Sequence, residues 1–211
     1  MKERRSQLER KSKETQIKVE LNIDGQGRTK IRTNIGLLDH MLELFAFHGF
    51  FDLSLEVKKA DLNVDIHHAN EDVGIVLGQI FKKALAEKKG IRRFGSAFAP
   101  MEDTLGHCVV DISGRGHLKI GFVEMMTFLR PRPPIKEDED GYSFKHLEHF
   151  LDSFAKNLGA NIIVTIKNPS SSADLHTVME TVFKSLGLAL DQATQIDPRR
   201  KGIPSTKGII D

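Results

Sequence analysis

A pattern of histidines and glutamates occurs twice in this sequence, and this repeat constrains the fold more than any other feature. The pattern is a histidine followed after 27 residues by a His-x-x-x-Glu motif, and its two copies lie 109 residues apart. The first copy consists of His40, His67 and Glu71, and the second of His149, His176 and Glu180. Other positions repeat at the same separation: Leu42 with Leu151, Phe45 with Phe154, Ala46 with Ala155, Val73 with Val182, Leu77 with Leu186, and Gly78 with Gly187. No gap is needed between residues 40 and 78, so the sequence predicts two copies of one α+β unit.

The repeat divides the chain into two similar halves, residues 1–95 and residues 96–211, which we expect to pack as one globular unit. The 211 residues are 39% apolar and 28% charged, which is enough material for a hydrophobic core. The net charge of +2 gives no indication of a nucleic-acid or membrane partner. A single cysteine, Cys108, excludes an internal disulfide and suits a reducing compartment such as the cytoplasm. The charged segment 1–13 contains no signal peptide or membrane span and is expected to be frayed.

Hydrophobic periodicity predicts the secondary structure of both halves. Alternation predicts strands over residues 16–23, 30–35, 51–57 and 61–66 in the first half, and over 105–112, 117–123 and 160–167 in the second. Helical spacing predicts helices over residues 37–47, 71–87, 144–158 and 175–192. Proline-rich or charged stretches predict surface loops over residues 131–142 and 168–173.

The repeated histidines and glutamates are candidate metal ligands. On a helix, His67 and Glu71 share a face, whereas His68 points about 100° away around the axis and would serve a different ion. Two halves related by a pseudo-twofold axis would then build two equivalent sites. Site A takes His40, His68, His176 and Glu180; site B takes His149, Thr177, His67 and Glu71. Three imidazoles and a carboxylate suit Mn, Fe or Zn more than Ca or Mg.

Threonine at position 177 deprives site B of its fourth ligand, so the pattern predicts one full and one weakened site. The alternative interpretation is that the histidines are satisfied by hydrogen bonds within a core, or lie at a solvated helix N-terminus. The basic, turn-rich tail over residues 197–208 also has two interpretations. It is either a solvated tail or an anion clamp made of Arg, Lys, hydroxyl groups and glycine amides.

Several stretches together resemble the imidazoleglycerol-phosphate dehydratase family, and the resemblance extends from about Lys13 to the C-terminus. The matching stretches are residues 10–15, 38–42, 47–49, 67–74, 93–95, 113–115, 148–150, 176–180, 197–200 and 205–208. Two departures matter. The family normally has a second histidine where this chain has Thr177, and its usual Asp-Glu pair appears here as Glu102-Asp103.

The resemblance implies a fold and an activity. The fold is α+β, with two tandem halves that each contain a four-stranded sheet with two helices on one face (ribosomal protein S5 domain 2-like). The activity is the dehydration of imidazole glycerol phosphate to imidazole acetol phosphate in histidine biosynthesis, through an imidazolate stabilised by a pair of Mn²⁺ ions. The resemblance also implies a homo-oligomer of 24 subunits built from trimers, with active sites completed by neighbouring chains.

The same resemblance implies roles for individual residues. Glu14 is the general acid–base; the alternative is a surface charge at the start of a strand. His48 contacts the substrate. The substrate-binding residues that would hold the phosphate are Arg93, Arg115, Ser205, Thr206 and Lys207, because Arg, Lys and hydroxyl groups suit a phosphate dianion.

Three functions remain open at this point. The first is an active dehydratase, and the second is a divergent homologue whose impaired site B leaves it inactive or altered. The third is an RNA-binding module with the same two-layer fold. The low net charge and the lack of an aromatic–basic surface pattern argue against the third.

Overall fold

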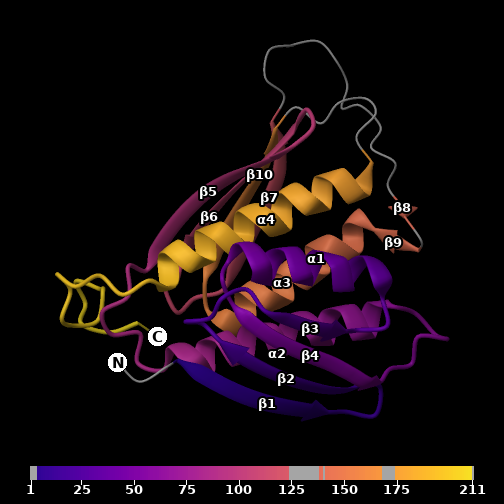
Figure 1. Ribbon diagram of the computed structural model, residues 1–211, viewed down its shortest axis with the longest axis horizontal. Coiled ribbons are helices and arrows are strands. Elements are labelled where there is room, and N and C mark those ends of the chain that lie inside the picture. The colour runs from indigo at the N-terminus through magenta and orange to yellow at the C-terminus, as the bar shows by residue number, and fades with distance from the viewer. Residues whose placement is uncertain (1–3, 124–137, 140, 168–173, 211) are drawn as a thin grey trace.

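The computed structural model describes residues 4–123, 138–139, 141–167 and 174–210 (Figure 1). They form two four-stranded sheets with four helices between them. The first sheet has the order β1 (Arg5–Lys11), β2 (Gln16–Asn22), β4 (Asp52–Lys59), β3 (Thr29–Arg32). The second has the order β5 (Phe94–Met101), β6 (Thr104–Asp111), β10 (Asn161–Lys167), β7 (His117–Val123). In each sheet one edge strand is parallel to its neighbour and the other pairs are antiparallel, so the sheets share one topology.

The helices form the layer between the sheets. They are α1 (Gly36–His48), α2 (His67–Leu85), α3 (Phe144–Leu158) and α4 (Leu175–Thr194). Helix α2 packs on β1 and β2, α4 packs on β5 and β6, and the helices pair across the halves as α2 with α3 and α1 with α4. A short hairpin, β8 (Asp138–Glu139) and β9 (Tyr142–Ser143), precedes α3. The predicted α+β fold of two similar halves, each with two helices on one face of its sheet, is confirmed.

One hydrophobic core joins the two halves. Strand alternation buries Ile17, Val19 and Leu21 against the helices while the intervening residues of β2 face solvent. Phe45 of α1 lies 5.9 Å from Phe81 and 6.1 Å from Phe154, measured between ring centroids, so side chains of both halves meet in the centre. No helix among the described residues is long and apolar enough to cross a bilayer.

The strand register shows that equivalent residues of the two halves are not all the same number of positions apart in the sequence. Leu21 pairs with Leu53 in the first sheet, and Val110 pairs with Ile162 in the second. Leu21 and Val110 are 89 residues apart, whereas Leu53 and Ile162 are 109 residues apart. The second half therefore contains 20 more residues than the first between its third strand and its first helix. The separation of 109 found in the sequence applies only from α1 onward.

Three predicted segments differ in the structure. Residues 61–66 form no strand but a turn, in which the Val64 amide bonds the Asp61 carbonyl oxygen at 2.8 Å and the Asp65 carboxylate accepts the His67 amide at 3.1 Å. Helix α2 consequently begins at His67 rather than at residue 71. The N-terminal segment is not frayed where the structure describes it, because β1 pairs with β2 along its length.

Strand β5 was not predicted, and the boundary proposed between residues 95 and 96 falls inside it. The predicted loop over residues 168–173 lies outside the described residues. Most of the predicted loop over residues 131–142 does so as well, apart from parts of the β8–β9 hairpin.

Two repeated glycines allow the paired helices to approach closely. A Cβ atom on Gly78 of α2 would lie 2.6 Å from the carbonyl oxygen of Phe154 in α3, and one on Gly187 of α4 would lie closer still to that of Phe45 in α1. Gly78 and Gly187 are equivalent in the repeat, as are Phe45 and Phe154, so the same helix–helix contact occurs twice in the molecule. Such contacts leave no room for a side chain.

The substitution Gly187→Ala is expected to lower the free energy of unfolding by about 1–3 kcal/mol, the usual effect of overpacking. Without a clash, alanine would stabilise the helix by about 1 kcal/mol relative to glycine. A decrease in the free energy of unfolding would therefore indicate the clash. Urea denaturation measures it, with Gly36→Ala in α1 as the control because a Cβ atom there meets nothing within 4 Å. A Gly187→Ala protein as stable as the control would contradict this packing.

Candidate metal centre and active site

Three candidate ligands converge where the N-terminal parts of α1 and α4 meet. We call His40, His176 and Glu180 the first cluster. His40 Nε2 lies 3.1 Å and His176 Nε2 lies 3.2 Å from the same oxygen, Glu180 Oε1. One ligand atom from each residue lies within 4.8 Å of the others, a spacing that one cation can bridge. Two imidazoles with a carboxylate form a mixed nitrogen–oxygen donor set suited to Mn, Fe or Zn.

The carboxylate of the first cluster is held ionised. Glu180 is only 8% exposed, and its second oxygen, Oε2, pairs with Lys184 one turn further along α4. Burial raises the pKa of Glu180, but the hydrogen bonds from Lys184 and His40 outweigh it and bring the pKa down to about 2. An ionised, oriented carboxylate is the form that a metal requires.

The pseudo-equivalent residues His67, Glu71 and His149 form a second cluster between α2 and α3. His67 Nδ1 lies 3.2 Å from His149 Nδ1, and His67 Nε2 lies 3.4 Å from Glu71 Oε2. Glu71 is more exposed than Glu180, with 45% of its side chain accessible against 10%. Ile75 occupies the position equivalent to Lys184, so no lysine fixes this carboxylate from one turn away.

Each cluster combines residues from both halves of the chain. The first takes His40 from the first half and its His-x-x-x-Glu motif from the second, and the second cluster reverses this order. The helix pairs α1–α4 and α2–α3 supply these contacts because each pair crosses at its repeated glycine. The repeat predicted this exchange, and the structure brings both sets of three side chains together.

The fourth residue predicted for each site lies elsewhere. His68 does not reach the first cluster but bonds Asp61 Oδ2 through Nδ1 at 3.0 Å, and this bond raises the pKa of His68. His68, Asp61 and Glu14 have ligand atoms within 4.8 Å of one another. Thr177 does not reach the second cluster; its amide bonds the Asp174 carboxylate at the start of α4 at 2.8 Å. Within one chain, both clusters therefore contain three predicted ligands.

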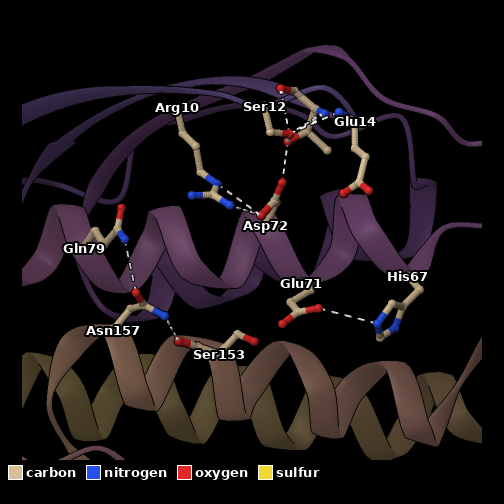
Figure 2. A network of polar contacts seen from close by, with 10 residues as sticks. Arg10, Ser12, Glu14, His67, Glu71, Asp72, Gln79, Ser153 and Asn157 are labelled. Carbon is tan, nitrogen blue, oxygen red and sulfur yellow. Dashed lines mark hydrogen bonds and ion pairs between the residues drawn. The ribbon is translucent and has the colours of Figure 1, made fainter.

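Glu14 lies at the tip of a short turn that joins β1 to β2 (Figure 2). The Ser12 hydroxyl accepts hydrogen bonds from the amides of Glu14 and Thr15, at 3.2 and 3.0 Å. The Glu14 carboxyl is exposed and close to His68. The candidate acid–base group is thus adjacent to a candidate metal ligand that is 54 residues away in the sequence.

The predicted phosphate-binding residues gather at one end of the second sheet. Arg93 binds Asp111 through Nε at 2.6 Å, and its Nη1 donates to the Pro204 carbonyl oxygen at 3.0 Å, which places the C-terminal tail against the start of β5. Ser205, Thr206 and Lys207 follow in that tail, where the Lys207 amide bonds the Ser205 hydroxyl at 3.2 Å. Arg115 lies in the β6–β7 turn, in which Ser113 Oγ accepts its amide at 3.4 Å.

This phosphate-binding group and the clusters lie at opposite ends of the helix layer. The Arg93 amide bonds the Ala193 carbonyl oxygen near the C-terminal end of α4, whereas Glu180 lies near its N-terminal end. Thirteen residues of helix separate Glu180 from Ala193, which corresponds to about 20 Å along the axis. Figure 1 shows the tail on one side of the molecule and β9, which leads into α3, on the other.

His48, the last residue of α1, lies near the first cluster. Burial and the charge of Lys184 lower the pKa of His48, while Glu180 opposes them. The ring is therefore neutral near pH 7 and has both a donor and an acceptor nitrogen for a polar ligand. Sequence reasoning missed Asp61 and Lys184, the direct partners of His68 and Glu180, because no pattern marks a second residue that orients a ligand.

Comparisons with known proteins identify the family to which this chain belongs. A sequence model of imidazoleglycerol-phosphate dehydratase matches residues 33–190. The imidazoleglycerol-phosphate dehydratase of Thermoanaerobacter pseudethanolicus is 48% identical over 98% of this chain and 100% of that protein, and that of Geobacter metallireducens is 45% identical over 97% and 98%.

Two crystal structures also match. That of the enzyme from Pyrococcus furiosus, in complex with (S)-C348, superposes with a TM-score of 0.75 at 32% identity, covering 96% of this chain and 99% of that one. The structure from Staphylococcus aureus gives a TM-score of 0.74 at 28% identity, covering 92% and 99%. This chain therefore belongs to the imidazoleglycerol-phosphate dehydratase family, hydro-lyases that carry out the dehydration step of histidine biosynthesis.

Proposed function

We propose that this dehydration, of imidazole glycerol phosphate to imidazole acetol phosphate, depends on two Mn²⁺ ions held by the two clusters. The observation that carries the proposal is the convergence of His40 Nε2, His176 Nε2 and an ionised Glu180 oxygen within 4.8 Å. The donor set fits a divalent transition metal, and the second cluster offers the same residue types. When bound, the two ions would stabilise the substrate ring as an imidazolate, which can expel the hydroxyl group.

The protein's own residues then have three tasks. Glu14 moves the carbon-bound proton that must be removed, a general acid–base role for which its exposed carboxyl is accessible. The neutral His48 ring orients the substrate. Arg115, Ser205, Thr206 and Lys207 hold the phosphate, with Arg93 fixing the tail that carries three of them.

The complete active site is assembled between copies of the chain. A substrate with a three-carbon chain is much shorter than the roughly 20 Å that separates the first cluster from the phosphate-binding group of the same chain. His68 also points away from the first cluster, and Asp61 Oδ1 beside it is buried without a hydrogen-bond partner among the described residues. We propose that His68 of a neighbouring copy completes the first cluster. The 24-subunit assembly of trimers rests on the family resemblance. The proposed cytoplasmic location rests on the presence of a single cysteine, Cys108, which allows no internal disulfide.

Complementation between two inactive chains tests the shared site. His68→Ala and His176→Ala are each expected to abolish turnover. Co-expressed as differently tagged chains and purified through both tags, they should recover part of it, because some sites then combine an intact His68 with an intact first cluster. The control pairs each variant with a chain that carries both substitutions, which should restore nothing. Mixed oligomers without turnover would refute the shared site.

Thr177 is the position at which the two metal sites are expected to differ. It is the repeat equivalent of His68, so it would face the second cluster of a neighbouring copy with a hydroxyl, a poorer ligand than imidazole. Thr177→His is expected to tighten Mn²⁺ at the weaker site by roughly tenfold to a hundredfold, the range typical of changes around metal ligands. Calorimetric titration measures this, with Thr177→Ala as the control. Two equally tight sites in the unmodified protein, with no gain from histidine, would show that the threonine is no defect.

Substitution of the phosphate-binding group tests the anion clamp. Lys207→Ala and Arg115→Ala each remove a charge-assisted contact worth about 1.5–3 kcal/mol, so the Michaelis constant should rise roughly tenfold to a hundredfold. Lys201→Ala is the matched control, because Lys201 is an exposed cation of the same tail but is not one of the proposed phosphate-binding residues. An unchanged Michaelis constant and unchanged inhibition by inorganic phosphate would contradict the assignment.

A further inference from the structure

Asp72 is a buried carboxylate that no step of the proposed reaction uses. It follows Glu71 in α2 but lies about 100° further around the helix, toward the β1–β2 turn, and it is only 7% exposed (Figure 2). Arg10 binds Asp72 Oδ1 through Nε at 3.1 Å and through Nη2 at 2.8 Å, and the Thr15 hydroxyl donates to Oδ2. One side chain of α2 thus contacts Thr15, at the end of the turn that carries Glu14, and Arg10, in the strand that leads into it.

The turn is rigid in itself, but Asp72 connects it to the helix. Ser12 and Thr15 close it through the Ser12 amide, which donates to the Thr15 carbonyl oxygen at 2.9 Å, and through the Ser12 hydroxyl, which accepts the Thr15 amide. Thr15 is fully buried, and its hydroxyl donates to Asp72 and also lies 3.3 Å from the Ser12 hydroxyl. The Glu14 amide also bonds Ser12. A displacement of Thr15 would therefore move the Glu14 backbone with it.

The first turn of α2 carries the candidate ligands His67, His68 and Glu71 as well. Asp72 therefore connects the turn that carries Glu14 to the part of α2 that carries these three ligands. A positional error of about 1 Å in a reacting group can cost roughly a hundredfold in rate. A buried, charge-assisted connection is the kind of contact that keeps such an error small.

We infer that Asp72 is a positioning residue, which holds Glu14 in register with the metal ligands of α2 through Thr15 and Arg10. The inference rests on the proposed acid–base role of Glu14. It predicts that loss of the connection lowers the catalytic rate without weakening substrate or metal binding. It also predicts that the effect disappears when Glu14 itself is absent.

The matched pair Thr15→Val and Thr15→Ser tests the connection at the residue least disruptive to the fold. Valine keeps the shape of threonine but cannot donate to Asp72, whereas serine keeps the hydroxyl. Thr15→Val, and in parallel Asp72→Asn, should lower kcat roughly tenfold to a hundredfold. Both should leave the Michaelis constant and the Mn²⁺ dissociation constant within about twofold of the unmodified protein, and Thr15→Ser should restore most of kcat.

Hydrogen exchange supplies a readout that does not depend on activity. The amides of residues 12–15 should exchange faster in Thr15→Val than in Thr15→Ser, while those of α2 and α3 remain protected. Loss of Mn²⁺ binding or protection throughout the protein would instead indicate a general structural role and would overturn the inference.

A double-mutant cycle separates this inference from the function on which it rests. In a Glu14→Gln chain, Thr15→Val should cause no further loss of kcat, because both changes act through one group. Additive losses would overturn the inference. If Glu14→Gln alone leaves kcat unchanged, the acid–base assignment fails. If Glu14→Gln lowers kcat and Thr15→Val does not, only the positioning role fails.

Discussion

Glu14→Gln is expected to lower kcat by about 10²–10⁴-fold, the usual contribution of a general acid–base group. The amide keeps the size of the side chain and its place on the Ser12–Thr15 turn, but it cannot accept a proton. The turn is fixed by backbone contacts and by Thr15, so the substitution leaves the local structure intact. The affinity for Mn²⁺ and the Michaelis constant should therefore change little.

Steady-state kinetics with imidazole glycerol phosphate measure this effect. Glu9→Gln in β1 is the matched control, because Glu9 is also a carboxylate near the N-terminus but bonds the Gln16 side chain on the outer sheet face. Its kcat should equal that of the unmodified chain. Full turnover by the Glu14→Gln protein would show that Glu14 takes no part in the mechanism and is only a surface charge.

Removal of the metal is expected to abolish turnover, and Mn²⁺ is expected to restore it. Without a cation, His40, His176 and Glu180 retain their hydrogen bonds, and the Lys184 ion pair keeps the carboxylate in place. The metal-free fold should thus persist, so the loss would reflect missing chemistry rather than unfolding. Chelation, gel filtration and a turnover assay before and after addition of Mn²⁺ test this sequence of events.

The His176→Ala variant should also lack turnover. Added Mn²⁺ should not restore it, because the ion cannot replace a missing ligand. His107→Ala is the control: His107 stacks on Phe98 with 3.9 Å between ring centroids and belongs to neither cluster. Its turnover should survive and should respond to chelation as the unmodified chain does. Full turnover by the metal-free protein would disprove metal dependence and leave the clusters as hydrogen-bonded polar groups.

The fold and the two clusters followed from the sequence because their determinants repeat. The repeated histidines and glutamates predicted three side chains of each cluster, but His68 and Thr177 lie elsewhere within one chain. The turn over residues 61–66 was missed because Leu62, Val64 and Ile66 alternate with polar residues, as a strand would, while Asp61 and Asp65 in fact hold a turn and the start of α2.

Strand β5 was missed because its pattern is inverted. Its buried side is made of small residues such as Ala97 and Ala99, whereas Phe94 and Phe98 are 59% and 51% exposed. The connection from Asp72 to Arg10 and Thr15 was missed for a different reason. Its partners lie 62 and 57 residues away, and a hydrogen bond over that separation follows from the packed fold rather than from a local pattern.

The exchange of ligands between halves has a consequence for how such a protein can originate. One half alone carries a lone histidine and a His-x-x-x-Glu motif that its own fold keeps apart, so a polypeptide of that length could form these clusters only as a twofold dimer with two identical centres. Joining two copies in one chain makes that encounter intramolecular and independent of protein concentration. The two centres also need no longer be identical, because each ligand is now encoded at its own position in the sequence. Lys184 opposite Ile75, and Thr177 opposite His68, are differences that a symmetric ancestor could not have had.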